Sequence, residues 1–229
     1  MAKHIGIVAC SAEGAALCYR TICAEGTVVM GRHAHPEISM HTHPLSEYMR
    51  FIYEDDWNGI AELMLDSAGK LARMGAELLI CPDNTIHQVF ELMLQRSPLP
   101  WLHIAEEVAA EAKRKDYRKL ALLGTKYLME GPVYPPKLAA QEIDFKIPEA
   151  EERRRINEII FDELVCGKFL PESRSYFVNV IRRFKDGGCD AVILGCTEIP
   201  LLIAPEDSPL PVLDSTRLLA RAALRKACL

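Results

Sequence analysis

The stretch GAELLICPDNTI, residues 75–86, returns later in the chain as GCDAVILGCTEI, residues 188–199. Each copy starts with a glycine suited to end a helix, continues as a short apolar run typical of a buried strand, and closes with a turn that opens a new helix. Aligned without gaps, the two copies place Asp83 opposite Cys196. Two equivalent turns that each carry a proton-transferring side chain predict two bases that face one substrate.

The repeat extends to either side of this stretch. SPLPWLHI at 97–104 returns as SPLPVLDS at 208–215, and KHIGIVACS at 3–11 resembles RKLALLGTK at 118–126. A period of roughly 110 residues is too long for a solenoid and fits two copies of one small α/β domain. A pseudo-twofold axis between the copies would put the two turns on opposite sides of a shared cleft.

Short apolar runs alternate with longer helical patterns, which predicts βαβ units and parallel sheets. The expected strands are His4–Ala9, Glu37–Met40, Leu78–Cys81, Trp101–His103, Leu120–Leu123, Asp144–Lys146, Ala191–Leu194 and Val212–Leu213. The expected helices include Trp57–Met74, Thr85–Gln95, Ile104–Lys113, Glu149–Cys166, Ser173–Asp186 and Ser215–Cys228. The predicted fold is α/β, with two similar three-layer domains and the active site in the interdomain cleft.

The domain boundaries follow from the repeat. We expect residues 1–96 with 207–229 to form the first domain, because the last strand and helix can return to complete it. Residues 97–206 then form the second domain. The sequence contains no low-complexity segment, and we expect no disordered linker.

Bulk composition excludes several classes of function. The chain has 229 residues, a hydrophobic content of 49% and a formal net charge of -5. Without a basic stripe it is not expected to bind nucleic acid, and without an apolar run of roughly 18 residues it is not expected to span a membrane. Eight cysteines without a CxxC pair favour reduced thiols in a cytoplasmic protein.

Cys196 follows an apolar strand at the point where a helix is expected to begin. Backbone N–H groups at a helix start stabilise a thiolate and can lower the pKa of a cysteine from about 8.5 toward neutrality. A thiolate of this kind is a competent general base. The alternative interpretation is a buried structural cysteine, and the repeat favours catalysis.

Asp83 is the counterpart of Cys196 in the first copy. An aspartate at a helix start is commonly an N-cap that accepts backbone N–H bonds, and this alternative stays open. As the partner of Cys196, Asp83 is a candidate acid or base. It needs a proton in order to act as an acid.

Small hydrogen-bonding residues surround the two turns, and with the N–H groups of two helix starts they predict a pocket for a substrate carboxylate. For each of these residues, ordinary capping is the alternative role. Two further residues inside the following helices, His87 and Glu198, either orient the bases or face solvent. The predicted substrate-binding residues are Ser11, Asn84, Thr85, Thr197, His87 and Glu198, of which the first four hold the carboxylate.

Two HxH pairs, His33 with His35 and His41 with His43, resemble zinc-binding pairs. No further ligand follows them at a helical spacing, so the sequence predicts no metal site. They are alternatively part of the cleft rim. Glycine-rich phosphate loops and the GxSxG motif of serine hydrolases are absent, so the sequence does not support nucleotide cofactor binding or serine hydrolysis.

Five segments together resemble the aspartate/glutamate racemase family over essentially the whole chain: GCTEI at 195–199, NTIH at 84–87, IFDEL at 160–164, LGT at 123–125 and PVLDST at 211–216. The resemblance implies a cofactor-independent enzyme of two α/β domains, commonly dimeric. It also implies two cysteines, one on each face of the substrate's α-carbon. Cys196 matches the second family cysteine. Asp83 stands where the first would fall.

The predicted function is therefore racemisation or epimerisation of an acidic amino acid, aspartate or glutamate, by Cys196 and Asp83. The partner is a small carboxylate substrate, and a homodimer is expected. One alternative keeps the fold and uses Cys196 alone in a decarboxylase or isomerase of a small dicarboxylic acid. Two weaker alternatives are a non-catalytic carboxylate-binding protein and a zinc hydrolase that uses the histidines.

Overall fold

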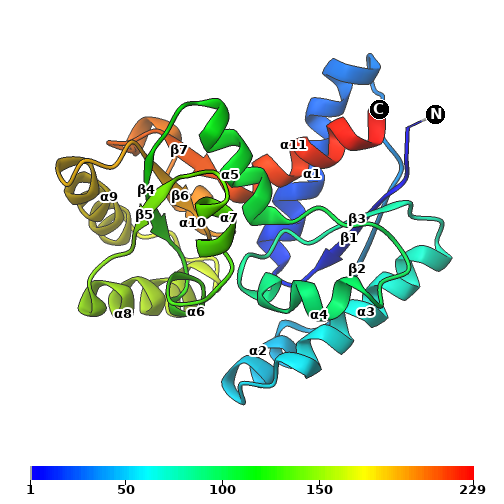
Figure 1. Ribbon diagram of the computed structural model, residues 1–229, viewed down its shortest axis with the longest axis horizontal. Helices are drawn as coiled ribbons and strands as arrows, with labels where there is room; N and C mark the ends of the chain where they lie inside the picture. Colours follow the sequence, from blue (N-terminus) through cyan, green and yellow to red (C-terminus); the bar gives the residue numbers. More distant parts are fainter. Residues whose placement is uncertain (1) are drawn as a thin grey trace. The chain divides into compact units, whose positions relative to one another are not determined.

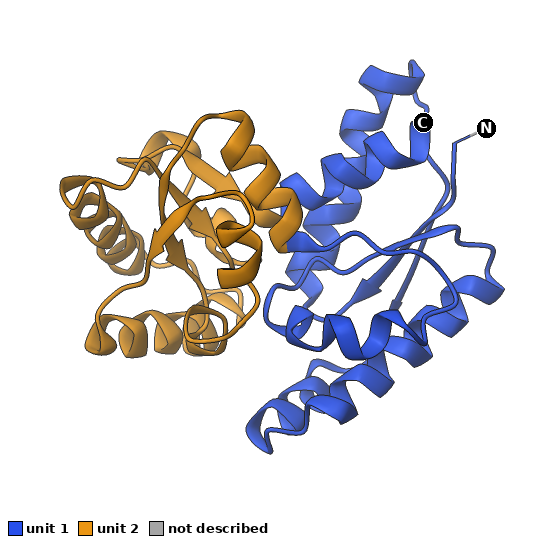
Figure 2. Ribbon diagram, viewed as in Figure 1, with its two compact units in different colours: residues 1–104, 216–229 blue, residues 105–215 orange. Residues whose placement is uncertain are grey.

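The structure is a computed structural model that describes residues 2–229. The chain forms two compact α/β units, which Figure 2 distinguishes by colour. Unit 1 contains the chain up to residue 104 together with residues 216–229, and unit 2 contains residues 105–215. The predicted α/β class with parallel sheets in two similar domains is confirmed.

The sheet of unit 1 has three parallel strands in the order β2-β1-β3. Ile7 in the central strand is paired with Met40 on one side and Ile80 on the other. Because the strands are parallel, the loops that follow them all begin at one edge of the sheet. The strands are β1 (Ile5–Ala9), β2 (Ile38–Thr42) and β3 (Leu78–Ile80).

Helices cover both faces of this sheet. Ile5, Ile7 and Ala9 share a buried cluster with side chains of α1 and α11, so these two helices cover one face (Figure 1). On the other face, a Cβ at Gly6 would come within 2.6 Å of Leu79 and 3.3 Å of Leu71 in α3. The helices of unit 1 are α1 (Ala12–Met30), α2 (Leu45–Tyr53), α3 (Trp57–Arg73), α4 (Phe90–Leu94), α11 (Ser215–Cys228) and the 3₁₀ helix η1 (Thr85–Val89).

The sheet of unit 2 has four parallel strands in the order β5-β4-β6-β7, with β4 and β6 at its centre. The strands are β4 (Lys119–Leu123), β5 (Asp144–Lys146), β6 (Ala191–Leu194) and β7 (Val212–Asp214). Side chains of β4 and β6 share a buried cluster with α8 and α9, while α5 lies on the opposite side of the sheet from α9 (Figure 1). The helices are α5 (Ile104–Arg114), α6 (Lys126–Met129), α7 (Pro135–Ala139), α8 (Ala150–Ile159), α9 (Pro171–Asp186), α10 (Ile199–Leu202), η2 (Ile160–Leu164) and η3 (Pro205–Asp207).

Each unit contains one copy of the sequence repeat, and the two copies share the same local backbone arrangement. In unit 1, β1 lies between β2 and β3, and β3 leads into the Asp83 turn. In unit 2, β4 lies likewise between β5 and β6, and β6 leads into the Cys196 turn. The two SPLP segments also match: Leu79 N–H donates to Pro100 O, and Val192 N–H donates to Pro211 O, each at 2.9 Å.

The division of the chain differs from the predicted boundaries at 96/97 and 206/207. Segment 97–104 stays with unit 1, where Trp101 forms a single bridge to Leu79 in place of the predicted strand. The segment after residue 207 does not return as a strand to unit 1, because β7 pairs with β6. Only α11 returns, and Lys3 N–H donates to Ala227 O at 2.8 Å.

Some helices also differ from the expectation. The predicted helix Thr85–Gln95 is a 3₁₀ turn followed by a short α-helix, and the predicted helix Glu149–Cys166 ends in the π-helical turn η2. In that turn Val165 N–H donates to Ile160 O, five residues back. Of the helices in the described part of the chain, none has the length and apolarity that a membrane crossing requires.

Candidate active site

The turn after β6 places a thiol, a hydroxyl and a carboxylate together inside unit 2. Cys196 Sγ lies 3.0 Å from Glu198 Oε2, and Thr197 Oγ1 donates to the same oxygen at 2.6 Å. Cys196 is 9% exposed, and Thr197 and Glu198 are each 2% exposed. Glu198 therefore does not face solvent. Its carboxylate contacts both Cys196 and Thr197.

The short contact between sulfur and oxygen requires a proton. A thiolate and a carboxylate at this distance would repel each other without one, and an S–H group that donates to a carboxylate relieves this repulsion. Since Thr197 also donates to Oε2, that oxygen is an acceptor. The Glu198 carboxylate is thus a hydrogen-bond acceptor for the Cys196 thiol. From the sequence, only the N–H groups of a helix start were expected to interact with this thiol. Helix α10 begins only at Ile199 and has four residues.

Gly195 is needed for space. A Cβ at this position would lie 2.5 Å from Leu128 Cδ2 and 3.0 Å from Leu123 O. Gly195 N–H donates to Leu123 O at 2.7 Å, which holds the start of the turn against the end of β4. The positive-φ glycines of the described chain do not include Gly195, so close packing is the reason for glycine here.

The matching turn in unit 1 follows β3 and carries Asp83. This side chain is half-buried, and its backbone carbonyl accepts a hydrogen bond from the ring of His87 at 2.7 Å. The N-cap position of η1 belongs to Asn84, whose side chain makes no capping hydrogen bond. The alternative role of Asp83 as the N-cap residue of this helix therefore does not match its position.

The ring of His87 hydrogen-bonds to the backbone on both sides. Its Nε2 accepts the N–H of Ile104 at 3.3 Å, so the ring proton is on Nδ1, which donates to the Asp83 carbonyl. The ring is 2% exposed and stacks on Phe90 with a centroid separation of 5.7 Å. Both ring nitrogens of His87 thus hydrogen-bond to backbone groups, which connect the Asp83 turn to the start of α5.

Two ionisable side chains next to this turn are kept neutral. Burial, and then the nearby Asp83 carboxylate, raise the pKa of Cys81 well above its ordinary value. Burial is also the largest cause that raises the pKa of Tyr48, followed by Cys10, Cys81 and Asp83. Cys81 therefore stays a thiol at neutral pH and does not replace the first family cysteine.

The other predicted binding residues lie at the edges where parallel strands end. Ser11 follows β1 and caps α1 by accepting the N–H of Gly14 at 3.3 Å. Asn84 and Thr85 follow β3 and are buried. In unit 1 the sheet thus brings together Ser11, Asp83, Asn84 and Thr85 at one edge, whereas Thr197 lies beside Cys196 in unit 2.

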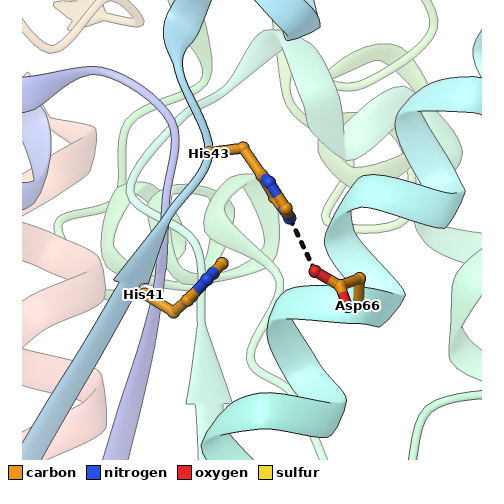
Figure 3. Close-up of side chains that lie close together, drawn as sticks. All are labelled: His41, His43 and Asp66. Carbon is orange, nitrogen blue, oxygen red and sulfur yellow. Dashed lines mark ion pairs between the residues drawn. The ribbon is translucent and has the colours of Figure 1, made fainter.

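The four histidines separate into two pairs. His41 and His43 lie at the end of β2, and their rings are 4.9 Å apart beside Asp66 of α3 (Figure 3). His33 hydrogen-bonds to Arg32, and His35 to the carbonyl of Pro36, so neither joins that group. Burial, and then Lys70 and His43, lower the pKa of His41 below its ordinary value. No local pattern in the sequence singled out Asp66, which lies 23 residues after His43.

The fold and the paired turns define a two-unit α/β enzyme of the racemase type. A sequence model of the Asp/Glu/Hydantoin racemase family matches residues 7–223 of this chain. The chain belongs to the Asp/Glu/Hydantoin racemase family, as the motifs predicted. Its family places it among the isomerases.

Solved structures with the same fold cover nearly the whole chain. A candidate Asp/Glu racemase from Yersinia pestis has a TM-score of 0.90 and 31% sequence identity, with 99% of this chain and 100% of that chain covered. An aspartate racemase homologue from Pyrococcus horikoshii has a TM-score of 0.86 and 29% identity, with the same coverage. A further relative, the broad-specificity amino-acid racemase RacX of Bacillus subtilis, is 23% identical over 171 residues, which are 74% of this chain and 73% of RacX.

Proposed function

We propose that this protein is a cofactor-independent racemase of an acidic amino acid, aspartate or glutamate, and that Cys196 and Asp83 act on opposite faces of the α-carbon. The observation that carries the proposal is the buried arrangement of Cys196 and Thr197 on Glu198, in a turn that the chain repeats around Asp83. The names of the similar proteins, which include a broad-specificity amino-acid racemase and an aspartate racemase homologue, support the substrate class.

In the proposed reaction, Glu198 accepts the Sγ proton of Cys196 and the resulting thiolate removes the α-proton of the substrate. The electron pair that remains on the α-carbon is delocalised into the substrate carboxylate. Protonated Asp83 then donates its proton to the opposite face. In the reverse direction the Asp83 carboxylate removes the α-proton and the Cys196 thiol returns one. Solvent restores the starting protonation of both groups.

The substrate carboxylate is held in this proposal by Ser11, Asn84, Thr85 and Thr197. These hydroxyl and amide groups, with neighbouring backbone N–H groups, supply the fixed dipoles that a carbanion requires. Because a carboxylate is a weaker base than a thiolate, removal of the proton by Asp83 is expected to be slower than removal by Cys196. The overall equilibrium between the enantiomers remains near one.

The test is incorporation of solvent deuterium at the α-carbon of both enantiomers of aspartate and glutamate. Asp83→Asn should slow racemisation by about 10²-fold or more, because one of the two proton carriers is lost. Asp144→Asn, an exposed aspartate on β5, is the matched control and should stay within about threefold of the unchanged protein. If none of the four substrates exchanges its α-proton, the substrate assignment is wrong.

A second candidate function is one-base chemistry on a small dicarboxylic acid, by decarboxylation or isomerisation. It is favoured by the replacement of the first family cysteine by Asp83 and by the neutral state of Cys81. Near-normal turnover by Asp83→Asn together with a large loss in Cys196→Ser would favour this candidate over the two-base racemase.

A further inference from the structure

A cluster outside the two catalytic turns brings together three side chains that bind metals in other proteins. His41 is in β2, His43 directly follows that strand, and Asp66 comes from the third turn of α3 (Figure 3). Each offers one ligand atom, and these atoms all lie within 4.8 Å of one another. We propose that His41, His43 and Asp66 bind a divalent transition-metal ion of the Zn²⁺ or Co²⁺ type.

The buried ring nitrogen Nε2 of His43 forms an ion pair with Asp66 but is not aligned for a hydrogen bond with it. His43 Nε2 lies 2.9 Å from Asp66 Oδ2, yet it is inaccessible to solvent and has no aligned hydrogen bond to any residue that the structure describes. A buried polar atom without an aligned partner costs free energy, so such atoms usually have one. A metal cation that accepts the lone pair of His43 Nε2 and also binds the Asp66 carboxylate would give this nitrogen an aligned partner.

His41 carries the outer hydrogen bond that metal-binding histidines need. A histidine that binds a metal through one ring nitrogen commonly hydrogen-bonds through the other, which fixes the orientation of its ring. His41 Nδ1 lies 2.9 Å from the hydroxyl of Ser67, which is fully buried in α3. The ring of His41 is therefore already held from the helix that supplies Asp66.

The ammonium group of Lys70 is the positive charge that pairs with Asp66 in this structure. This group lies 2.6 Å from Asp66 Oδ2, the same oxygen that is close to His43. Zinc–ligand bonds of about 2.0–2.2 Å place neighbouring ligand atoms roughly 3.3 Å apart. The 2.9 Å between His43 Nε2 and Asp66 Oδ2 is close to this value. A modest side-chain rotation brings the most distant pair of ligand atoms, which lie within 4.8 Å of each other, to the same separation. Asp66 is exposed enough to make this movement, and Lys70 must move away.

The ligand types select the ion. Two imidazoles and one carboxylate suit Zn²⁺, Co²⁺ or Ni²⁺, whereas Mg²⁺ and Ca²⁺ prefer a set of oxygen ligands. Water would complete the coordination. Such an ion would link the end of β2, an edge strand of the sheet, to α3. It would stabilise unit 1 at the same sheet edge as the Asp83 turn, without taking part in the proposed proton transfer.

The test uses the full chain, freed of metal by a chelator and kept reduced. Titration with Co²⁺, followed by visible absorption, should give one equivalent without the sulfur-to-metal charge-transfer band that a cysteine ligand produces, and Zn²⁺ should displace it. Mg²⁺ should neither bind nor compete. The double variant H41Q/H43Q should weaken Co²⁺ binding by about 10²-fold, and Asp66→Asn by about tenfold or more.

Two controls separate this site from the other groups of the protein. H33Q/H35Q removes the other HxH pair and should leave Co²⁺ affinity unchanged. Lys70→Met removes the competing ammonium and should tighten Co²⁺ binding severalfold, the opposite of what loss of a ligand does. Far-ultraviolet circular dichroism of each metal-free variant verifies its fold, and Asp66→Asn, at an exposed position, keeps the test available if H41Q/H43Q does not fold.

Three results would overturn the proposal. They are the absence of stoichiometric Co²⁺ binding by the unchanged chain, equal binding by Asp66→Asn or H41Q/H43Q, and a thiolate charge-transfer band that assigns the ion to cysteines. The readout is metal binding, so it does not depend on whether the proposed racemase activity is found.

Discussion

Replacement of Glu198 by glutamine tests the proposed role of the proton acceptor at Cys196. Glutamine keeps the size of the side chain and removes its negative charge. The change alters the one carboxylate that lies 3.0 Å from Sγ and 2.6 Å from the Thr197 hydroxyl. If Glu198 takes the thiol proton during the reaction, Glu198→Gln removes that acceptor, and Cys196 can act only in the fraction of molecules that has already lost this proton to solvent.

The expected magnitude follows from the ordinary acidity of cysteine. A thiol with a pKa of about 8.5 is only about 3% ionised at pH 7. We therefore expect α-proton exchange initiated by Cys196 to fall by about 10²-fold at pH 7, with partial recovery of about tenfold per pH unit as the thiol ionises. Loss of a charged acceptor should also cost about 1–3 kcal/mol of stability.

The assay is deuterium incorporation between pH 6.5 and 9 with the substrate that the unchanged protein accepts. Peptide-resolved alkylation of Cys196 by iodoacetamide gives a second readout that needs no substrate, and it should slow in the same proportion. Glu206→Gln, an exposed glutamate of η3, is the matched control. Exchange and alkylation within about threefold of the unchanged protein, with the same pH profile, would refute a proton acceptor at Glu198.

Two further predictions concern stability. Because burial and Asp83 raise the pKa of Cys81 in the folded chain, the unfolded chain loses this proton first, so the free energy of unfolding should fall above about pH 9, by up to 1.4 kcal/mol per pH unit. Urea unfolding at pH 7–10 should show a shallower fall for Cys81→Ala, and an identical slope would contradict the buried thiol. Gly195→Ala should lower the melting temperature, because its Cβ would lie 2.5 Å from Leu128, at a cost of about 1–3 kcal/mol. Gly69→Ala, in α3 with its nearest neighbour at 3.6 Å, should raise it instead; equal effects of the two alanines would argue against the close packing at Gly195.

The strands at the centre of each sheet could be predicted from the sequence because short apolar runs are a local property. Ala191–Leu194 has the predicted bounds and Lys119–Leu123 begins one residue before its prediction, and the repeat of the SPLP segment reflects the same backbone pairing in both units. Helices α1 and α2 were missed. The α1 sequence mixes glycine, threonine and cysteine with its apolar residues, so its packing against β1 and α11, rather than a local pattern, explains its burial.

The candidate site was predictable wherever one short segment carries it. Cys196 and Asp83 follow strands that the sequence identifies, and the family motifs around them are contiguous. The partner of Cys196 lies only two residues away, yet its role could not be read from the sequence. Whether Glu198 faces solvent or the thiol depends on how the turn packs under β6 and α10.

The sequence by itself determined the α/β class, the duplication, the family and the positions of the two candidate bases, because short contiguous segments carry the pattern or motif from which each is recognised. Only the tertiary structure decided that β7 completes the second sheet, that His87 holds the Asp83 carbonyl, and that Asp66 joins His41 and His43. These relations join residues that are distant along the chain, or they depend on the direction in which a side chain points. Both are fixed by packing and hydrogen bonding in the folded protein, and local composition does not encode them.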